Sequence, residues 1–157
     1  MTVTPIPRAV AVVLAGDRAL VIKRYLRHPS AADCAMCADT GTVGPDCPGH
    51  RYAVLPGGGV APGESPVEAA LRELGEETTL AARAGRLLWT GDHNGRPASY
   101  FLMADVTGTP VLSGEEAAAQ SPDNAFTLIW ATAADLDALG LYPADVRARL
   151  ARLLRGD

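Results

Sequence analysis

Three glutamates near the middle of the chain, Glu73, Glu76 and Glu77, are spaced so that one face of a helix carries all three side chains. Carboxylates this close repel one another unless cations lie between them. Mg²⁺ takes oxygen ligands and is typically held by a few carboxylates together with the phosphates of a substrate. The spacing therefore indicates a metal-dependent enzyme that acts on phosphates. For Glu76 and Glu77 alone, a solvated acidic helix face is the simpler alternative.

The three cysteines of the chain and one histidine form a second group, ordered Cys34-x2-Cys37-x9-Cys47-x2-His50. Paired C-x2-C and C-x2-H units let two turns grip one tetrahedral ion, which predicts a structural Zn²⁺ site with a closed coordination sphere. His28 is the second choice for the fourth ligand. The alternatives are a redox pair formed by Cys34 and Cys37, or free thiols without a metal.

The helix that carries the three glutamates has a well-marked start. Ser65 is placed to cap it, Pro66 suits its first position, and Glu68 completes a capping box. An apolar stripe lies roughly 115° away from the acidic face; it consists of Val67, Ala70, Leu71 and Leu74. One helix can therefore pack on a core with one side and hold metal with another. Arg72 borders the acidic face, where it can orient Glu73 by a charge-assisted hydrogen bond.

The rest of the chain mixes strands with a few helices. Strands are predicted at residues 8–15, 19–24, 52–55, 86–90, 99–106 and 126–131, and helices at residues 133–139 and 143–154. Residues 110–121 are predicted to form a loop. Residues 25–50 make an unusually long connection between two strands, and a zinc site would explain that length. At 157 residues the chain is interpreted as one domain, residues 1–157, with residues 25–50 inserted in it.

The stretch from Gly58 to Leu80 resembles the Nudix box, G-x5-E-x7-R-E-U-x-E-E-x-G-U, in which U is a bulky aliphatic residue. The matching residues are Gly58, Glu64, Arg72, Glu73, Leu74, Glu76, Glu77 and Leu80. Thr79 replaces the family glycine where the helix ends, and a β-branched residue is costly in the left-handed conformation often needed there. We therefore expect an altered helix end. The segment L-P-G-G-G-V before the box and W-x5-L at residues 130–136 extend the resemblance to most of the chain except residues 25–50.

The resemblance implies an α/β fold, an α/β/α sandwich with a mixed central β-sheet, here with a zinc-stabilised loop insertion. It also implies that Glu73, Glu76 and Glu77 hold a catalytic Mg²⁺ or Mn²⁺ ion. The glycine turn at Gly57 and Gly58 adjoins this metal, and the Gly57 carbonyl is a candidate ligand.

Three further roles follow from the resemblance. Glu64 supports the metal cluster through a bound water or hydrogen bonds, and Arg72 orients Glu73. The general base lies on the box helix in some branches of the family and on a downstream loop in others. That loop is residues 113–116 here, so Glu115 and Glu116 are candidates for the base or for a further metal ligand.

The implied reaction is hydrolysis of the diphosphate linkage of a nucleoside diphosphate joined to another group, such as ADP-ribose, or of a nucleoside triphosphate. The alternative is a regulatory domain that binds a nucleotide without turnover, which the intact glutamate set disfavours. A non-hydrolytic diphosphate isomerase ranks last, because zinc explains the cysteines better. Tyr52 is a candidate to stack on a base, whereas His93 and Asn94 are interpreted as turn residues.

The composition narrows the range of partners. A net charge of −4 argues against a general binder of nucleic acid polymers, because no basic excess exists to neutralise phosphates. No apolar run approaches the ~20 residues of a membrane span, and the first residues, M-T-V-T-P-I-P-R, lack a secretory signal pattern. We therefore expect a cytoplasmic protein whose partner is a small nucleotide or another diphosphate. The sequence leaves a homodimer open.

Overall fold

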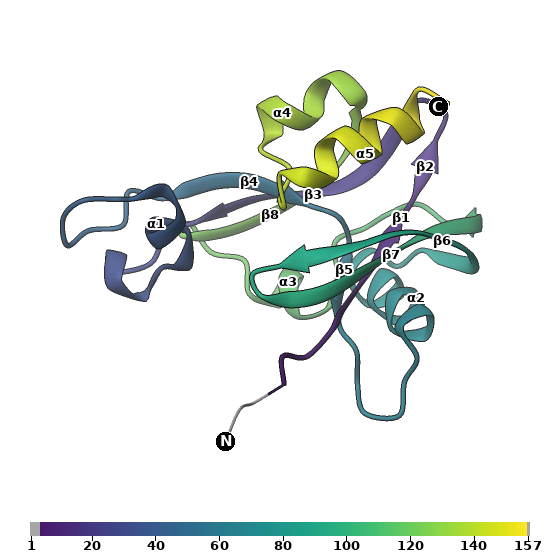
Figure 1. Cartoon of the computed structure of the whole chain (residues 1–157), viewed down its shortest axis with the longest axis horizontal. Helices are drawn as coiled ribbons and strands as arrows, with labels where there is room; N and C mark the ends of the chain where they lie inside the picture. Colours follow the sequence, from purple (N-terminus) through teal and green to yellow (C-terminus); the bar gives the residue numbers. More distant parts are fainter. Residues whose placement is uncertain (1–3, 157) are drawn as a thin grey trace.

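The computed structural model describes residues 4–156; residues 1–3 and 157 of the predicted domain lie outside the described part. Its strands form two sheets, and Figure 1 shows their arrangement. The first sheet has the order β5 (Gly57–Gly59), β1 (Arg8–Val12), β7 (Arg96–Thr107) and β6 (Ala81–His93). The second contains β2 (Leu14–Ala15), β3 (Arg18–Leu26) and β4 (His50–Val54), with β8 (Asn124–Thr132) also paired to β3. The first sheet is mixed, because β1 and β7 run parallel while its other pairs are antiparallel.

Helices cover both faces of the strands (Figure 1). They are α1 (Ala35–Thr40), α2 (Pro66–Thr78), α3 (Gly114–Ala118), α4 (Leu136–Leu139) and α5 (Asp145–Leu154), with short 3-10 turns η1 (Ala31–Asp33) and η2 (Ala133–Asp135). Val10 and Val12 pack in a core that includes residues of α4 and α5, whereas Ala9 and Ala11 pack in a second core with α2. Since side chains alternate along a strand, β1 supplies both cores. The predicted α/β/α sandwich with a mixed sheet is confirmed. Within residues 4–156, no helix has the length and apolar character needed to cross a membrane.

Several predicted boundaries need correction. The strands at residues 86–90 and 99–106 extend into a long hairpin, β6 and β7, because they pair almost to the tip, where Asn94 and Gly95 take positive φ. Residues 110–121 are not a loop throughout, since α3 lies within them. The strand predicted at residues 19–24 continues to Leu26, because Tyr25 and Leu26 pair with β4 on one side and β8 on the other.

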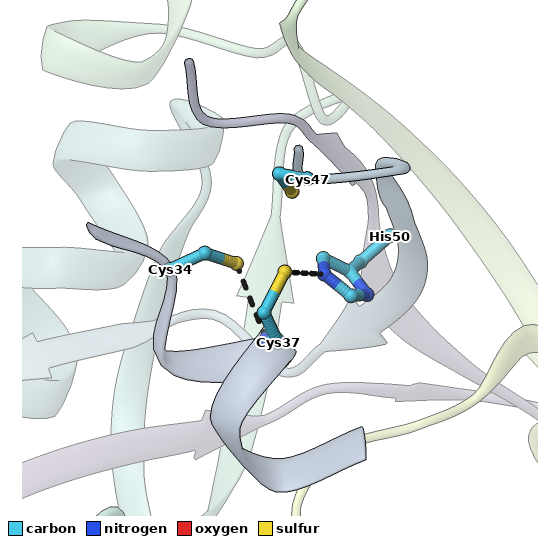
Figure 2. Close-up of side chains that lie close together, drawn as sticks. All are labelled: Cys34, Cys37, Cys47 and His50. Atoms are coloured by element: carbon cyan, nitrogen blue, oxygen red, sulfur yellow. Dashed lines mark hydrogen bonds between the residues drawn. The ribbon is translucent and has the colours of Figure 1, made fainter. Parts of the chain in front are cut away.

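The connection between β3 and β4, residues 27–49, together with His50 at the start of β4, is called the Cys3His knuckle from here on. It is not structureless. The Cys34 thiolate or thiol accepts the hydrogen bond of the Cys37 backbone N–H and so caps α1, and Gly41, in the left-handed conformation, ends it. Three cysteines and His50 converge at its centre (Figure 2). The long connection is therefore organised around this group.

The box helix α2 begins as predicted. The Ser65 side chain accepts a hydrogen bond from the Glu68 backbone N–H, and the Glu68 carboxylate accepts one from the Ser65 hydroxyl. The prediction that its end has an altered geometry is wrong. Thr79 takes the left-handed conformation, with φ 64°, and its N–H donates to the Gly75 carbonyl at 3.0 Å. Its hydroxyl donates a hydrogen bond to the Thr109 carbonyl. The helix therefore ends with the backbone geometry that a glycine would adopt, but with local strain, because threonine is β-branched.

That strain predicts a stabilising substitution. Thr79→Gly removes the clash of a β-branched side chain in the left-handed conformation and loses one exposed hydrogen bond. We expect the free energy of unfolding to rise by about 1 kcal/mol, which corresponds to an increase of about 3 °C in Tm. Denaturant unfolding of the two proteins measures the difference. A destabilised glycine variant would show that the Thr109 contact outweighs the backbone strain.

Candidate active site

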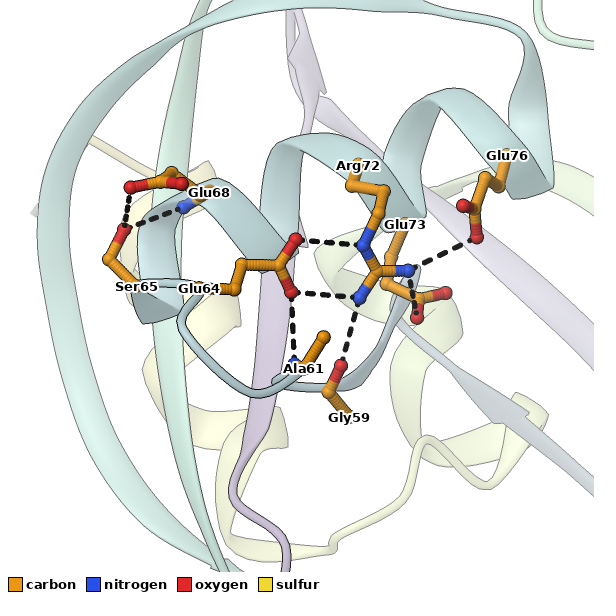
Figure 3. Close-up of polar contacts among 8 residues, drawn as sticks. All are labelled: Gly59, Ala61, Glu64, Ser65, Glu68, Arg72, Glu73 and Glu76. Carbon is orange, nitrogen blue, oxygen red and sulfur yellow. Dashed lines mark hydrogen bonds and ion pairs between the residues drawn. The ribbon is translucent and has the colours of Figure 1, made fainter.

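Arg72 connects the acidic face of α2 to the loop before it (Figure 3). Its guanidinium donates to both oxygens of Glu64, at 2.8 and 3.0 Å, in a bidentate pair. The same group donates to Glu73 at 3.0 Å, to Glu76 at 3.2 Å and to the Gly59 carbonyl at 3.0 Å. One arginine therefore fixes the positions of three carboxylates and the glycine turn.

Glu64 contacts α2 through Arg72. Its other interaction is with the Ala61 backbone N–H, at 3.0 Å. The hydrogen bond from Arg72 and that from Ala61 hold the pKa of Glu64 at about 2. Glu64 is thus ionised at any working pH, and it does not line the carboxylate pocket described below. Its contacts favour support of the metal site by hydrogen bonds to Arg72.

Glu77 differs from its neighbours because it is buried. Its Oε2 accepts a hydrogen bond from the Gly57 backbone N–H at 3.3 Å, which links the end of α2 to the glycine turn. Burial, then the charge of Glu116 and contact with Glu73, raises the pKa of Glu77 to about 9. Burial also raises the pKa of Glu116, whose Oε2 is buried without a hydrogen-bond partner among the described residues. Crowded, desolvated carboxylates of this kind fit a divalent cation, which would neutralise them.

The three box glutamates share one pocket, with a volume of about 420 Å³, whereas Gly57, the fourth predicted ligand of the catalytic metal, lines a different cleft. Its lining consists of Arg72, Glu73, Glu76, Glu77, Gly114, Glu115 and Glu116. The two glutamates of α3 differ, since Glu115 is exposed and Glu116 is half-buried. The pocket thus brings the box glutamates and the downstream candidates together.

Backbone contacts hold both flanks of this pocket against α2. A Cβ on Gly58 would lie 2.4 Å from the Glu73 carboxylate carbon, so a side chain there would displace Glu73. On the other flank, the Ser113 N–H donates to the Glu77 carbonyl at 2.8 Å. Gly114 has φ 72°, and a Cβ there would meet the Glu76 carbonyl at 2.8 Å. Close approach of α3 to the end of α2 therefore positions Glu116.

A second cleft, of about 220 Å³, adjoins the first, since Glu77 and Glu116 line both. Arg8, Arg24 and the knuckle also line it. Neither arginine was among the site residues predicted from the sequence. The available signal was weak: Arg8 is the charged first residue of an otherwise apolar strand, and Arg24 follows Lys23 in the second half of β3. His93 and Asn94, interpreted as turn residues, line the cleft as well, and so does Tyr52.

The Cys3His group is compact. Its four ligand atoms, from Cys34, Cys37, Cys47 and His50, all lie within 4.8 Å of one another (Figure 2). The Cys37 Sγ is 3.2 Å from the His50 Nε2, and the three cysteines are buried and free of disulfides. His50, not His28, completes the group. Among the described residues, only these four place their potential ligand atoms so close together. The carboxylates of Glu73 and Glu76 are instead hydrogen-bonded to Arg72. Three sulfurs and one imidazole nitrogen at such distances fit a tetrahedral zinc ion.

A family model described as NUDIX domain matches residues 5–150. A MutT NUDIX hydrolase from Burkholderia pseudomallei has a similar structure, with a TM-score of 0.61 and 25% identity over 92% of this chain and 95% of that one. An ADP-ribose pyrophosphatase from Streptococcus suis gives a TM-score of 0.62 and 16% identity, covering 98% and 92% of the two chains. A NUDIX hydrolase from Nitrosomonas europaea gives 0.62 and 17%, covering 98% and 90%. A search of curated proteins gives no match.

Proposed function

The chain belongs to the Nudix family, and from this premise we propose that it hydrolyses the diphosphate linkage of a nucleoside diphosphate joined to another group, using Mg²⁺ or Mn²⁺. The observation that supports the proposal is the pocket that Glu73, Glu76, Glu77 and Glu116 line together with Arg72. An ADP-ribose-like compound and a nucleoside triphosphate are both substrates of the proposed class.

The charged side chains at the pocket have distinct roles in the proposed mechanism. Glu73, Glu76 and Glu77 would hold the metal, and the Gly57 backbone N–H orients Glu77. A divalent cation held there would neutralise the diphosphate and activate a water molecule. Arg72 keeps Glu73 and Glu76 oriented through its hydrogen bonds, and Glu64 fixes Arg72. Positioning and electrostatic stabilisation of this kind supply most of the catalysis in phosphoryl chemistry.

Glu116 is the proposed general base. Its raised pKa favours proton acceptance, and it lines both the carboxylate pocket and the adjoining cleft. Glu116→Gln is expected to lower kcat by about 10²–10⁴-fold with little change in KM. Steady-state kinetics with Mg²⁺ measures the effect, with Glu115→Gln, the exposed neighbour on α3, as the matched control. An unchanged rate for Glu116→Gln would move the base to α2.

The Cys3His group is the proposed site of a structural Zn²⁺ ion. Support comes from the compactness of its four ligand atoms and from the closed character of a four-ligand set. Four protein ligands would leave no position for a reacting water, so this ion would take no part in the hydrolysis.

A substrate screen tests the proposed function. The purified protein is incubated with Mg²⁺ and a panel of nucleoside diphosphate sugars, dinucleoside polyphosphates and nucleoside triphosphates, with Glu77→Gln as the blank. Turnover that disappears in the variant supports the proposal and identifies the substrate class. Tight binding of a nucleotide without turnover by the wild-type protein would instead favour the regulatory alternative.

A further inference from the structure

The knuckle forms one wall of the cleft next to the carboxylate pocket. Ala35 and Met36 of α1 line this cleft together with Cys34, and Arg24 and Tyr52 contribute from β3 and β4. The same cleft reaches Glu77 and Glu116. A diphosphate held at the metal helix would therefore have its attached group beside the knuckle.

Unpartnered polar atoms are concentrated in this cleft. Among the described residues, the buried side-chain polar atoms without a hydrogen-bond partner belong to Arg8, Arg24, Trp89, His93 and Glu116. All of these residues except Trp89 line the cleft. Buried polar groups in folded proteins are nearly always hydrogen-bonded, and exceptions need an explanation such as a missing ligand. The guanidinium groups of the two arginines carry only donors, so a ligand that contacts them must offer acceptors.

Arg24 is held in place by its surroundings. Its guanidinium lies 4.1 Å from the centre of the Phe126 ring and 5.6 Å from that of Tyr52, and its Nη2 donates to the Asn124 Oδ1 at 2.7 Å. Its Nε is buried and has no hydrogen-bond partner among the described residues. A guanidinium plane, a tyrosine ring and a methionine thioether all pack well on flat aromatic groups. Ala35 and Met36 offer apolar surface, so the knuckle side of the cleft suits the flat face of a nucleobase, while polar side chains such as His93 and Asn94 line other parts of it.

We propose that the Cys3His knuckle is the wall that holds the nucleobase of the substrate, between Met36 on one side and Arg24 and Tyr52 on the other. The inference rests on the proposed function for the position of the diphosphate. Base carbonyls or ring nitrogens supply the acceptors for Arg24. Met36 lies between Cys34 and Cys37 in the sequence and packs against the cysteine cluster. The integrity of that cluster therefore sets affinity for the base.

Binding measurements on the full chain test this proposal without requiring turnover. The probes are the four nucleoside 5′-monophosphates and inorganic pyrophosphate, each with Mg²⁺, studied by titration calorimetry. Met36→Ala is expected to weaken the tightest mononucleotide by about fivefold or more, since a packing face on the ring is lost, and to leave pyrophosphate affinity unchanged. Cys37→Ser, checked for an intact α2 by circular dichroism, should weaken the mononucleotide at least as much. Val43→Ala is the matched control, because Val43 lies in the knuckle but is 97% exposed and outside the cleft lining.

Two outcomes would overturn the proposal. One is mononucleotide affinity that Met36→Ala leaves unchanged. The other is an equal loss of mononucleotide and pyrophosphate affinity, which would mean that the knuckle acts on the metal site. Failure of the proposed function looks different: no diphosphate is hydrolysed, yet mononucleotide binding still depends on Met36.

Discussion

Glu77→Gln is expected to lower turnover by at least about 10³-fold while the protein stays folded. Glu77 is the buried member of the three box glutamates, and glutamine lacks the negative charge that a divalent cation requires. The measurement is kcat/KM with Mg²⁺ on the best substrate of the panel. Glu68→Gln is the matched control, since it makes the same change on the same helix, outside the carboxylate pocket.

The same substitution should stabilise the metal-free protein. Because the pKa of Glu77 is raised to about 9 in the folded state, from 4.5, the folded protein holds a proton that the unfolded chain releases. Stability from this group therefore falls as pH rises between these two values. Glutamine removes that penalty, so we expect a gain of about 2 kcal/mol near pH 8 and little gain near pH 5.

With Mg²⁺ bound, the wild-type protein should become more stable than Glu77→Gln. Added Mg²⁺ binds the folded wild-type protein and raises its Tm, whereas Glu77→Gln should show little or no shift. Thermal melts with and without Mg²⁺ at pH 5 and pH 8 give all four comparisons. A variant that retains near-normal turnover, or that gains the same Mg²⁺ stabilisation as the wild type, would remove Glu77 from the metal site.

The box helix could be predicted from the spacing of residues that are close in the sequence. The cap at Ser65, the apolar stripe and the acidic face all depend on residues within one helix, so their mutual positions follow from helical geometry. The contact between Arg72 and Glu73 was predicted for the same reason. The α/β/α layers followed from the family resemblance, and the two cores confirm them.

Long-range packing explains what the sequence did not reveal. Arg8 and Arg24 meet in one cleft because β1 and β3 lie in different sheets whose ends converge there, and no spacing along the chain encodes that arrangement. The helix at residues 114–118 depends on contacts with the end of α2, through Ser113 and Gly114. At Thr79, helix-end geometry outweighed the conformational preference of a β-branched residue.

The Cys3His group depends both on local spacing and on long-range packing. Each pair, C-x2-C and C-x2-H, is local, but the two pairs meet only because β3 and β4 bring residues 26 and 50 side by side. The strands thus close the knuckle at its base, and the four ligand atoms close it at its centre. A bound ion would therefore order residues that contribute little apolar surface to either core.

Cys37→Ser is expected to abolish stoichiometric zinc binding and to lower the free energy of unfolding by about 3 kcal/mol, equivalent to about 6–12 °C in Tm. A serine hydroxyl is a poor zinc ligand, and the change leaves two buried sulfurs and His50 without their ion. Metal analysis of protein purified without chelator and a thermal melt measure the two effects. Ala38→Ser, which adds a serine at an exposed position of the same helix α1, is the matched control.

The site at which Cys37→Ser is first cleaved by a protease helps to distinguish the possible roles of the cysteines. If zinc orders the knuckle, limited proteolysis of Cys37→Ser should cut first within residues 27–49, while α2 stays protected, because the knuckle packs on neither core. Free thiols without a metal predict unchanged melting and no zinc in the wild-type protein. A redox pair predicts a Cys34–Cys37 disulfide that forms under oxidant and is lost in the variant. Zinc at one equivalent in the wild-type protein, absent in Cys37→Ser, is the result that supports the structural site.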